Sequence, residues 1–117
     1  MTQIASKYLL TSLVTAGVAL LFSTSAVAAV DAAAAKKLAR MDSCLRCHAV
    51  AKKKEGPAYQ AIAYKYKGNP DAVDTLFKHL TSGAKVKLSD GHEETHKIAK
   101  ANNDDEIKNL IGWILAQ

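Results

Sequence analysis

Five consecutive residues constrain this chain more than any other part of its sequence: Cys44-Leu45-Arg46-Cys47-His48. They contain the only two cysteines of the chain, separated by two residues, with a histidine directly after the second. This pattern is typical of covalent haem attachment, in which both thiols form thioether bonds to the porphyrin and the histidine binds the iron. We therefore predict one covalently attached haem c, bound through Cys44 and Cys47, with His48 as an axial iron ligand.

The cysteine pair has two alternative interpretations, a redox dithiol of the thioredoxin type and one half of a zinc site. A thioredoxin-like motif follows a strand within a βαβ pattern, and this sequence has no such pattern. A zinc site would need further ligands, and no other cysteine is present. Haem attachment is therefore favoured over both.

The segment from Met1 to Ala28 has the layout of a secretory signal peptide. Lys7 precedes an apolar run from Tyr8 to Phe22, and small residues follow it at positions 26 to 28. The run of about 15 residues is shorter than the roughly 20 that a membrane-spanning helix needs. We predict cleavage after Ala28, which leaves residues 29–117 as one exported, periplasmic domain without a stable membrane anchor.

Helical signals recur along residues 29–117 and no strand pattern appears, so we predict an all-α fold of about four short helices. The expected helices cover 31–47, 58–66, 70–82 and a segment from about 103 onward. The first should begin at Asp31 as N-cap and bury four side chains at helical spacing: Ala34, Leu38, Met41 and Leu45. The last should bury an apolar face beside Trp113: Ile107, Leu110, Ile111 and Ile114.

The segment between the last two expected helices, residues 84–101, shows no sustained periodicity and contains His92 and His96. A loop of this length in so small a domain is usually functional or disordered. His79, in the preceding helix, is about 100° around the helix axis from Leu80 in the apolar stripe. We interpret His79 as a solvated surface residue.

Residues 29–117 as a whole resemble a small bacterial class I cytochrome c. The haem motif closes the first expected helix, the segment Gly56-Pro57-Ala58-Tyr59 is similar to the family's segment after that motif, and an aromatic residue stands at Trp113. The resemblance implies helices wrapped around a haem, with Pro57 and Trp113 among the residues beside it. It also implies that the Pro57 carbonyl accepts a hydrogen bond from the second ring nitrogen of His48.

The same resemblance implies that the first and last helices cross. In that arrangement Leu38 and Met41 would lie near Leu110 and Trp113.

The chain departs from the family at the distal iron ligand, which is usually a methionine in the loop before the terminal helix. The two methionines of this chain are at positions 1 and 41, and Met41 belongs to the proximal-side helix. Imidazole is a good iron ligand, and His96 precedes Trp113 by nearly the same stretch of sequence as the family's methionine would. We predict His48 and His96 as the two axial ligands, with His92, Lys97 or an open position as alternatives to His96.

The resemblance implies an electron-transfer protein rather than an enzyme, and histidine in place of methionine implies a low reduction potential. The net charge of +5 and the many lysines favour a redox partner with an acidic docking surface, and candidate contacts are Lys52, Lys53, Lys54, Lys85 and Lys87. Nucleic acid is disfavoured because the aromatic residues are not interleaved with the lysines.

Two alternative functions follow from the alternatives for the distal ligand. A haem whose distal position is open or displaceable would bind or sense carbon monoxide, nitric oxide or oxygen. An enzyme would need an acid–base group beside an open iron, for which the sequence offers only His92, Glu93 and Glu94. We therefore predict no catalytic residue.

Overall fold

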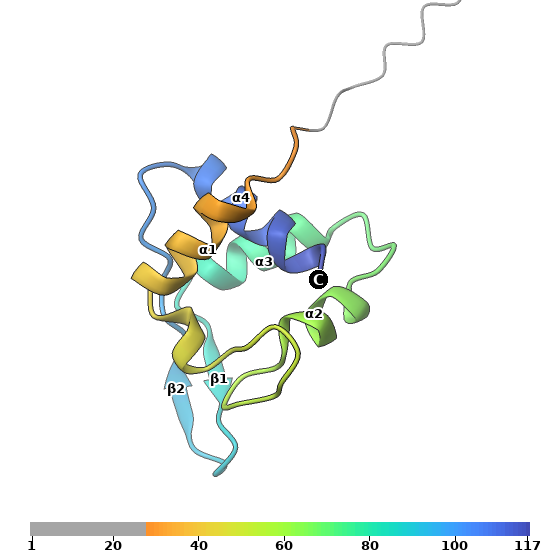
Figure 1. Cartoon of the computed structure of the whole chain (residues 1–117). Helices are drawn as coiled ribbons and strands as arrows, with labels where there is room; N and C mark the ends of the chain where they lie inside the picture. Colours follow the sequence, from red (N-terminus) through yellow and green to blue (C-terminus); the bar gives the residue numbers. More distant parts are fainter. Residues whose placement is uncertain (1–27) are drawn as a thin grey trace, which may run out of the picture.

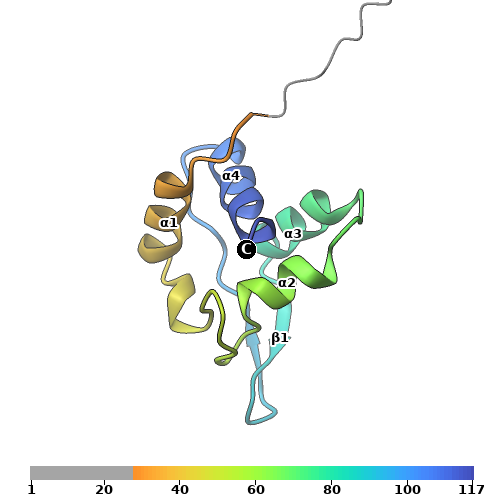
Figure 2. The ribbon, with the colours of Figure 1, turned by 45° about the vertical axis from the view of Figure 1, so that its right-hand side comes forward.

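The computed structural model describes residues 28–117, so nearly all of the predicted signal peptide lies outside the described residues. Within this range the chain forms, in order, α1 (Ala32–Met41), the 3₁₀ turn η1 (Cys44–Arg46), α2 (Tyr59–Lys65), α3 (Ala72–Thr81), β1 (Lys85–Lys87), β2 (Glu93–Thr95) and α4 (Asp104–Leu115). The prediction of about four short helices is confirmed. Figures 1 and 2 show α1, α2 and α3 arranged around α4, and the β1–β2 hairpin projecting away from the helices at the bottom of both views.

Helix α1 starts as the sequence predicts but ends six residues earlier. The Asp31 side chain accepts a hydrogen bond from the Ala34 backbone N–H at 2.9 Å, which caps the first turn. The helix ends at Met41 because Ser43 adopts a left-handed conformation, with φ of 59°, and the chain then turns into η1. The cysteine motif therefore lies on a separate 3₁₀ turn, which changes the direction of the chain before His48.

The buried face of α1 differs from the predicted one. Its buried residues are Ala35, Leu38 and Ala39, whereas Met41 is 68% exposed. The prediction was wrong at Ala34, which is exposed while its neighbour Ala35 is buried, because the buried face is rotated by one residue at the start of the helix. It was also wrong at Met41 and Leu45, because it extended the helical periodicity beyond the point where the helix ends. No helix in the range 28–117 is long and apolar enough to cross a membrane.

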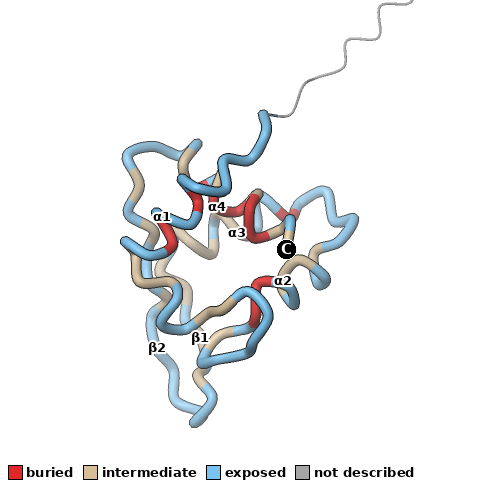
Figure 3. The backbone as a smooth tube through the Cα atoms, in the orientation of Figure 1, coloured by how far each residue is buried: buried red, intermediate tan, exposed pale blue. Residues whose placement is uncertain are grey.

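The hydrophobic core lies where α1 and α2 pack against α4. Figure 3 shows the buried backbone concentrated in these helices, and the core cluster consists of Ala35, Leu38, Ala39, Tyr59, Leu110, Trp113 and Ile114. Two hydrogen bonds join the start of α1 to α4: Asp31 N–H donates to Asn109 Oδ1 at 2.8 Å, and Asn109 Nδ2 donates to the Asp31 carbonyl at 2.9 Å. The predicted contact between the first and last helices is confirmed for Leu38, which packs in one cluster with Leu110 and Trp113, but not for Met41, which is exposed.

The other two helices begin close to the predicted positions. Helix α3 starts two residues after Pro70, and the Asn69 side chain accepts a hydrogen bond from the Asp71 N–H at 2.9 Å in the preceding turn. Helix α4 is capped by Asn103, whose side chain accepts from the Glu106 N–H at 3.1 Å. The starting points of α3 and α4 are therefore set by residues close to them in the sequence.

The β1–β2 hairpin lies in the segment predicted to lack regular structure. Lys85 pairs with Thr95, Val86 with Glu94 and Lys87 with Glu93, in antiparallel register. Each strand has only three residues and Val86 is the one apolar side chain among the six, so no alternating pattern could indicate it. The hairpin brings residues 84 and 96 together, because the His96 N–H donates to the Ala84 carbonyl at 2.8 Å.

Candidate haem site

The two cysteines lie on and directly after η1, beside the core. Cys44 is half-buried and packs against the core cluster, whereas Cys47 is exposed. The turn is closed by the His48 N–H, which donates to the Cys44 carbonyl at 3.0 Å. Cys44, Cys47 and His48 are thereby presented together by one short turn.

The His48 ring is held on two sides. Its Nδ1 donates to the Pro57 carbonyl at 2.7 Å, the hydrogen bond that the sequence resemblance predicted. Its face stacks on the Tyr59 ring, with centroids 5.4 Å apart and an interplanar angle of 16°. Because a carbonyl only accepts, the proton is on Nδ1, and the lone pair of Nε2 is free for a metal.

Gly56 allows the chain to pass directly against this imidazole. A Cβ atom at position 56 would lie 2.5 Å from His48 Cε1 and 2.9 Å from its Nε2, closer than nonbonded atoms approach. The Gly56 N–H also donates to the Cys47 carbonyl at 2.8 Å, which ties the loop back to the motif. Position 56 must therefore be glycine for steric reasons.

His96 lies across from His48, at the end of β2. The two ring centroids are 6.3 Å apart with an interplanar angle of 55°. His96 Nδ1 donates to the Lys97 carbonyl at 2.9 Å, so the Nε2 lone pair of this second imidazole is also free. Burial, followed by the neighbouring His79, lowers the pKa of His96, which keeps the imidazole neutral and able to bind a metal.

The separation of these two rings suits a metal ion between them. A metal–imidazole bond of about 2 Å puts the ring centroid about 3 Å from the metal, so two rings on opposite sides of one metal lie about 6 Å apart. The 6.3 Å between His48 and His96 matches that value. The residues present therefore fit a haem iron with two imidazole ligands.

His92, the alternative distal candidate, is engaged elsewhere. It is an exposed residue near the hairpin tip, with its Nδ1 hydrogen-bonded to Asp90 and its Nε2 hydrogen-bonded to Glu94 at 3.1 Å. These partners, Glu94 first and then Asp90, raise the pKa of His92. One of the two ring nitrogens would have to leave its carboxylate before His92 could bind a metal.

His79 is part of the site, which corrects its interpretation as a solvated surface residue. It is half-buried, and its ring centroid lies 4.2 Å from that of His96 at an interplanar angle of 48°. Burial, followed by His48, lowers the pKa of His79. His79 lies beside the apolar stripe of α3, and the prediction considered only whether it contacts the core. In the structure this side of α3 faces His96.

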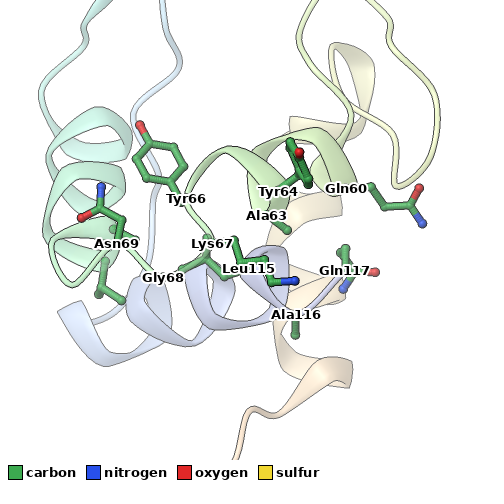
Figure 4. Close-up of a pocket in the computed structure, with 12 residues that line it drawn as sticks. Gln60, Ala63, Tyr64, Tyr66, Lys67, Gly68, Asn69, Leu115, Ala116 and Gln117 are labelled. Carbon is green, nitrogen blue, oxygen red and sulfur yellow. The ribbon is translucent and has the colours of Figure 1, made fainter.

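A groove elsewhere on the molecule lies between α2, the turn after it and the end of α4 (Figure 4). Its lining includes Tyr64, Tyr66, Lys67 and Leu115, but neither cysteine and none of the four histidines. The candidate haem site is therefore separate from this groove.

Comparison with known proteins identifies the family. The family model described as Cytochrome c matches residues 32–117. The chain belongs to the cytochrome c family. The cytochrome c-552 of Hydrogenobacter thermophilus is 35% identical over 81 residues, which cover 69% of this chain and 79% of that protein. The cytochrome c-551 of Pseudomonas aeruginosa is 31% identical over 74 residues, 63% of this chain and 67% of that protein.

Solved structures agree with this assignment. The class 1 cytochrome MtoD from Sideroxydans lithotrophicus ES-1 matches with a TM-score of 0.73 and 52% identity, over 75% of this chain and 97% of that one. The cytochrome c552 of Nitrosomonas europaea matches with a TM-score of 0.53 and 30% identity, over 68% of this chain and 95% of that one. The protein is therefore a small class I monohaem cytochrome with a covalently attached haem c, and its general function is electron transfer.

Proposed function

We propose that this cytochrome is a periplasmic electron carrier of low potential, whose haem is attached through Cys44 and Cys47 and bound axially by His48 and His96. The observation that carries the proposal is the matched pair of imidazoles: each has Nδ1 committed to a backbone carbonyl, and the rings are 6.3 Å apart. The haem, when bound, supplies the one-electron chemistry.

The low potential follows from the type of distal ligand. A methionine ligand raises the reduction potential of a haem, and imidazole in its place removes that effect. The carbonyl oxygens of Pro57 and Lys97 accept hydrogen bonds from His48 and His96, which increases the basicity of both rings. Both effects favour the oxidised state.

Two aromatic residues support the proximal side. Tyr59 is only 2% exposed, stacks on His48, and contacts Trp113 edge-on at a centroid distance of 5.4 Å. Burial raises the pKa of the Tyr59 hydroxyl, which therefore stays protonated. We propose that Trp113 acts on the haem site through Tyr59, by excluding water and holding the ring that orients His48.

Exposed lysines around the two histidines are the proposed docking contacts. Lys53 pairs with His48 in an isolated β-bridge, Lys85 and Lys87 lie on the hairpin, and Lys97 directly follows His96. A partner with an acidic surface would be attracted to them, with an association rate that falls as salt screens the charges. Stopped-flow electron transfer to an acidic redox protein at increasing ionic strength measures this dependence.

The proposed periplasmic location rests on the sequence of the segment from Met1 to Ala28, and on the compartment to which such a segment delivers a chain for haem attachment. Mass spectrometry of the exported protein would detect a chain beginning at Ala29 with one haem added. A retained segment before Ala29 would contradict the proposed cleavage.

Spectroscopy of the holoprotein tests the ligation. Wild type, His96→Ala and the control His92→Ala are compared by visible and electron-paramagnetic-resonance spectra in both oxidation states, and by carbon monoxide added to the reduced form. We expect wild type and His92→Ala to be low-spin and to bind carbon monoxide only slowly, because His96 must leave the iron first, and His96→Ala to become high-spin and bind it at once. A wild-type reduced protein that binds carbon monoxide at once would overturn the proposal and favour small-gas binding.

A further inference from the structure

We propose that His79 is a positioning residue for the distal ligand, and that its ring fixes the orientation of the His96 imidazole. This inference rests on the proposed ligation by His96. The two ring centroids are 4.2 Å apart, closer than any other aromatic pair in the described part of the chain. His79 lies in the last turn of α3, whereas His96 follows a strand, so the contact joins a ligand on a loop to a helix.

The backbone around His96 is also tied to the end of α3. The His96 N–H donates to the Ala84 carbonyl, and the Ala99 N–H donates to the Leu80 carbonyl, each at 2.8 Å. Gly83 lies between these points with φ of +64°, and a Cβ there would meet Thr95 Cγ2 at 3.3 Å. These contacts place the His96 backbone relative to α3 and leave the rotation of its ring to be fixed by side-chain contacts.

Two contacts on the His96 ring bear on that rotation. The hydrogen bond from Nδ1 goes to Lys97, the next residue, so its acceptor moves together with the loop. The His79 ring belongs to α3 and does not move with the loop. Like Tyr59 beside His48, His79 is thus a ring from a helix next to a ligand imidazole, although this pair is tilted by 48° whereas the Tyr59–His48 pair is stacked at 16°.

The test compares holoprotein variants at position 79. His79→Ala removes the ring, His79→Phe retains an aromatic face without ring nitrogens, and His92→Ala is the control for a histidine outside the site. We expect His79→Ala to remain low-spin but with altered g values in the ferric state, and its reduced form to bind carbon monoxide roughly three- to tenfold faster, as expected for loss of one aromatic contact. His79→Phe and His92→Ala should keep the wild-type g values and carbon monoxide kinetics.

Two results would overturn this role. His79→Ala could retain wild-type g values and carbon monoxide kinetics, or His79→Phe could fail to restore them. In the first case, thermal unfolding followed by circular dichroism shows whether His79→Ala has lost stability, which would mean that His79 is a purely structural residue. Failure of the underlying ligation is recognised separately, because His96→Ala would then keep the wild-type low-spin spectrum.

Discussion

The ring centroids of His48 and His96 lie 6.3 Å apart, yet the two residues are held by different kinds of structure. His48 is fixed within a short stretch of sequence, by the Pro57 carbonyl and the buried Tyr59 ring. His96 is fixed by long-range contacts, through the hairpin register and the end of α3. We therefore expect the proximal side, at His48, to tolerate little change, whereas the distal side, at His96, can accommodate a different ligand on the same fold.

The largest expected effect is on the proximal side, at Gly56. Gly56→Ala should destabilise the holoprotein by about 2–4 kcal/mol, because the added methyl group overlaps the His48 ring and displaces its hydrogen bond to Pro57. Gly68→Ala is the matched control: it meets no atom within 4 Å, and its φ of +74° should cost only about 1–2 kcal/mol. Denaturant unfolding measures both, and equal losses would contradict the steric role of Gly56.

Two variants of Tyr59 distinguish the contribution of its ring to stability from that of its hydroxyl group. Tyr59→Leu should cost about 2–4 kcal/mol, because it removes a buried ring that contacts both His48 and Trp113. Tyr59→Phe should change stability by less than about 1 kcal/mol, because the buried hydroxyl has no hydrogen-bond partner among the described residues. Chemical unfolding of the two variants measures the difference, and a large loss in Tyr59→Phe would show that the hydroxyl is used.

The smallest effect is expected at the hairpin on the distal side, from the pH dependence of His92. Glu94 and Asp90 raise its pKa, so protonated His92 stabilises the hairpin fully below the unfolded-state value of 6.5, and this contribution is lost as pH rises through the higher folded-state pKa. The Glu55 carboxylate, which is hydrogen-bonded to Ser89, adds a further negative charge near His92. Unfolding midpoints of wild type and His92→Gln are compared from pH 5 to 9: the advantage of wild type should be small, present at the acid end and lost as pH rises. A difference between the two proteins that does not change with pH would rule out this contribution of His92.

The features predicted correctly from the sequence are local ones. Asp31 and Asn103 cap their helices through bonds spanning three residues, and the cysteine motif needs no distant partner to be recognised. The hydrogen bond from His48 to Pro57 joins residues nine apart and was inferred from the family resemblance. Such features depend on residues that are neighbours in the sequence.

The features that were missed depend on contacts between distant segments. The hairpin pairs three-residue strands with almost no apolar pattern, and the role of His79 depends on a ring that lies beyond the hairpin in the sequence. The early end of α1 follows from the left-handed Ser43, for which the periodicity of Ala34, Leu38 and Met41 gave no signal. The sequence favours His96 over His92 as the distal ligand, which stays a prediction, and the hydrogen bonds of His92 to two carboxylates are consistent with it.

A redox titration of wild type beside His96→Met, which supplies the ligand usual in the family, tests axial ligation by His48 and His96. We expect a low potential for wild type and a clearly higher one for His96→Met, because a thioether replaces an imidazole on the iron. An unchanged potential in His96→Met, with an unchanged low-spin spectrum, would show that His96 does not bind the iron.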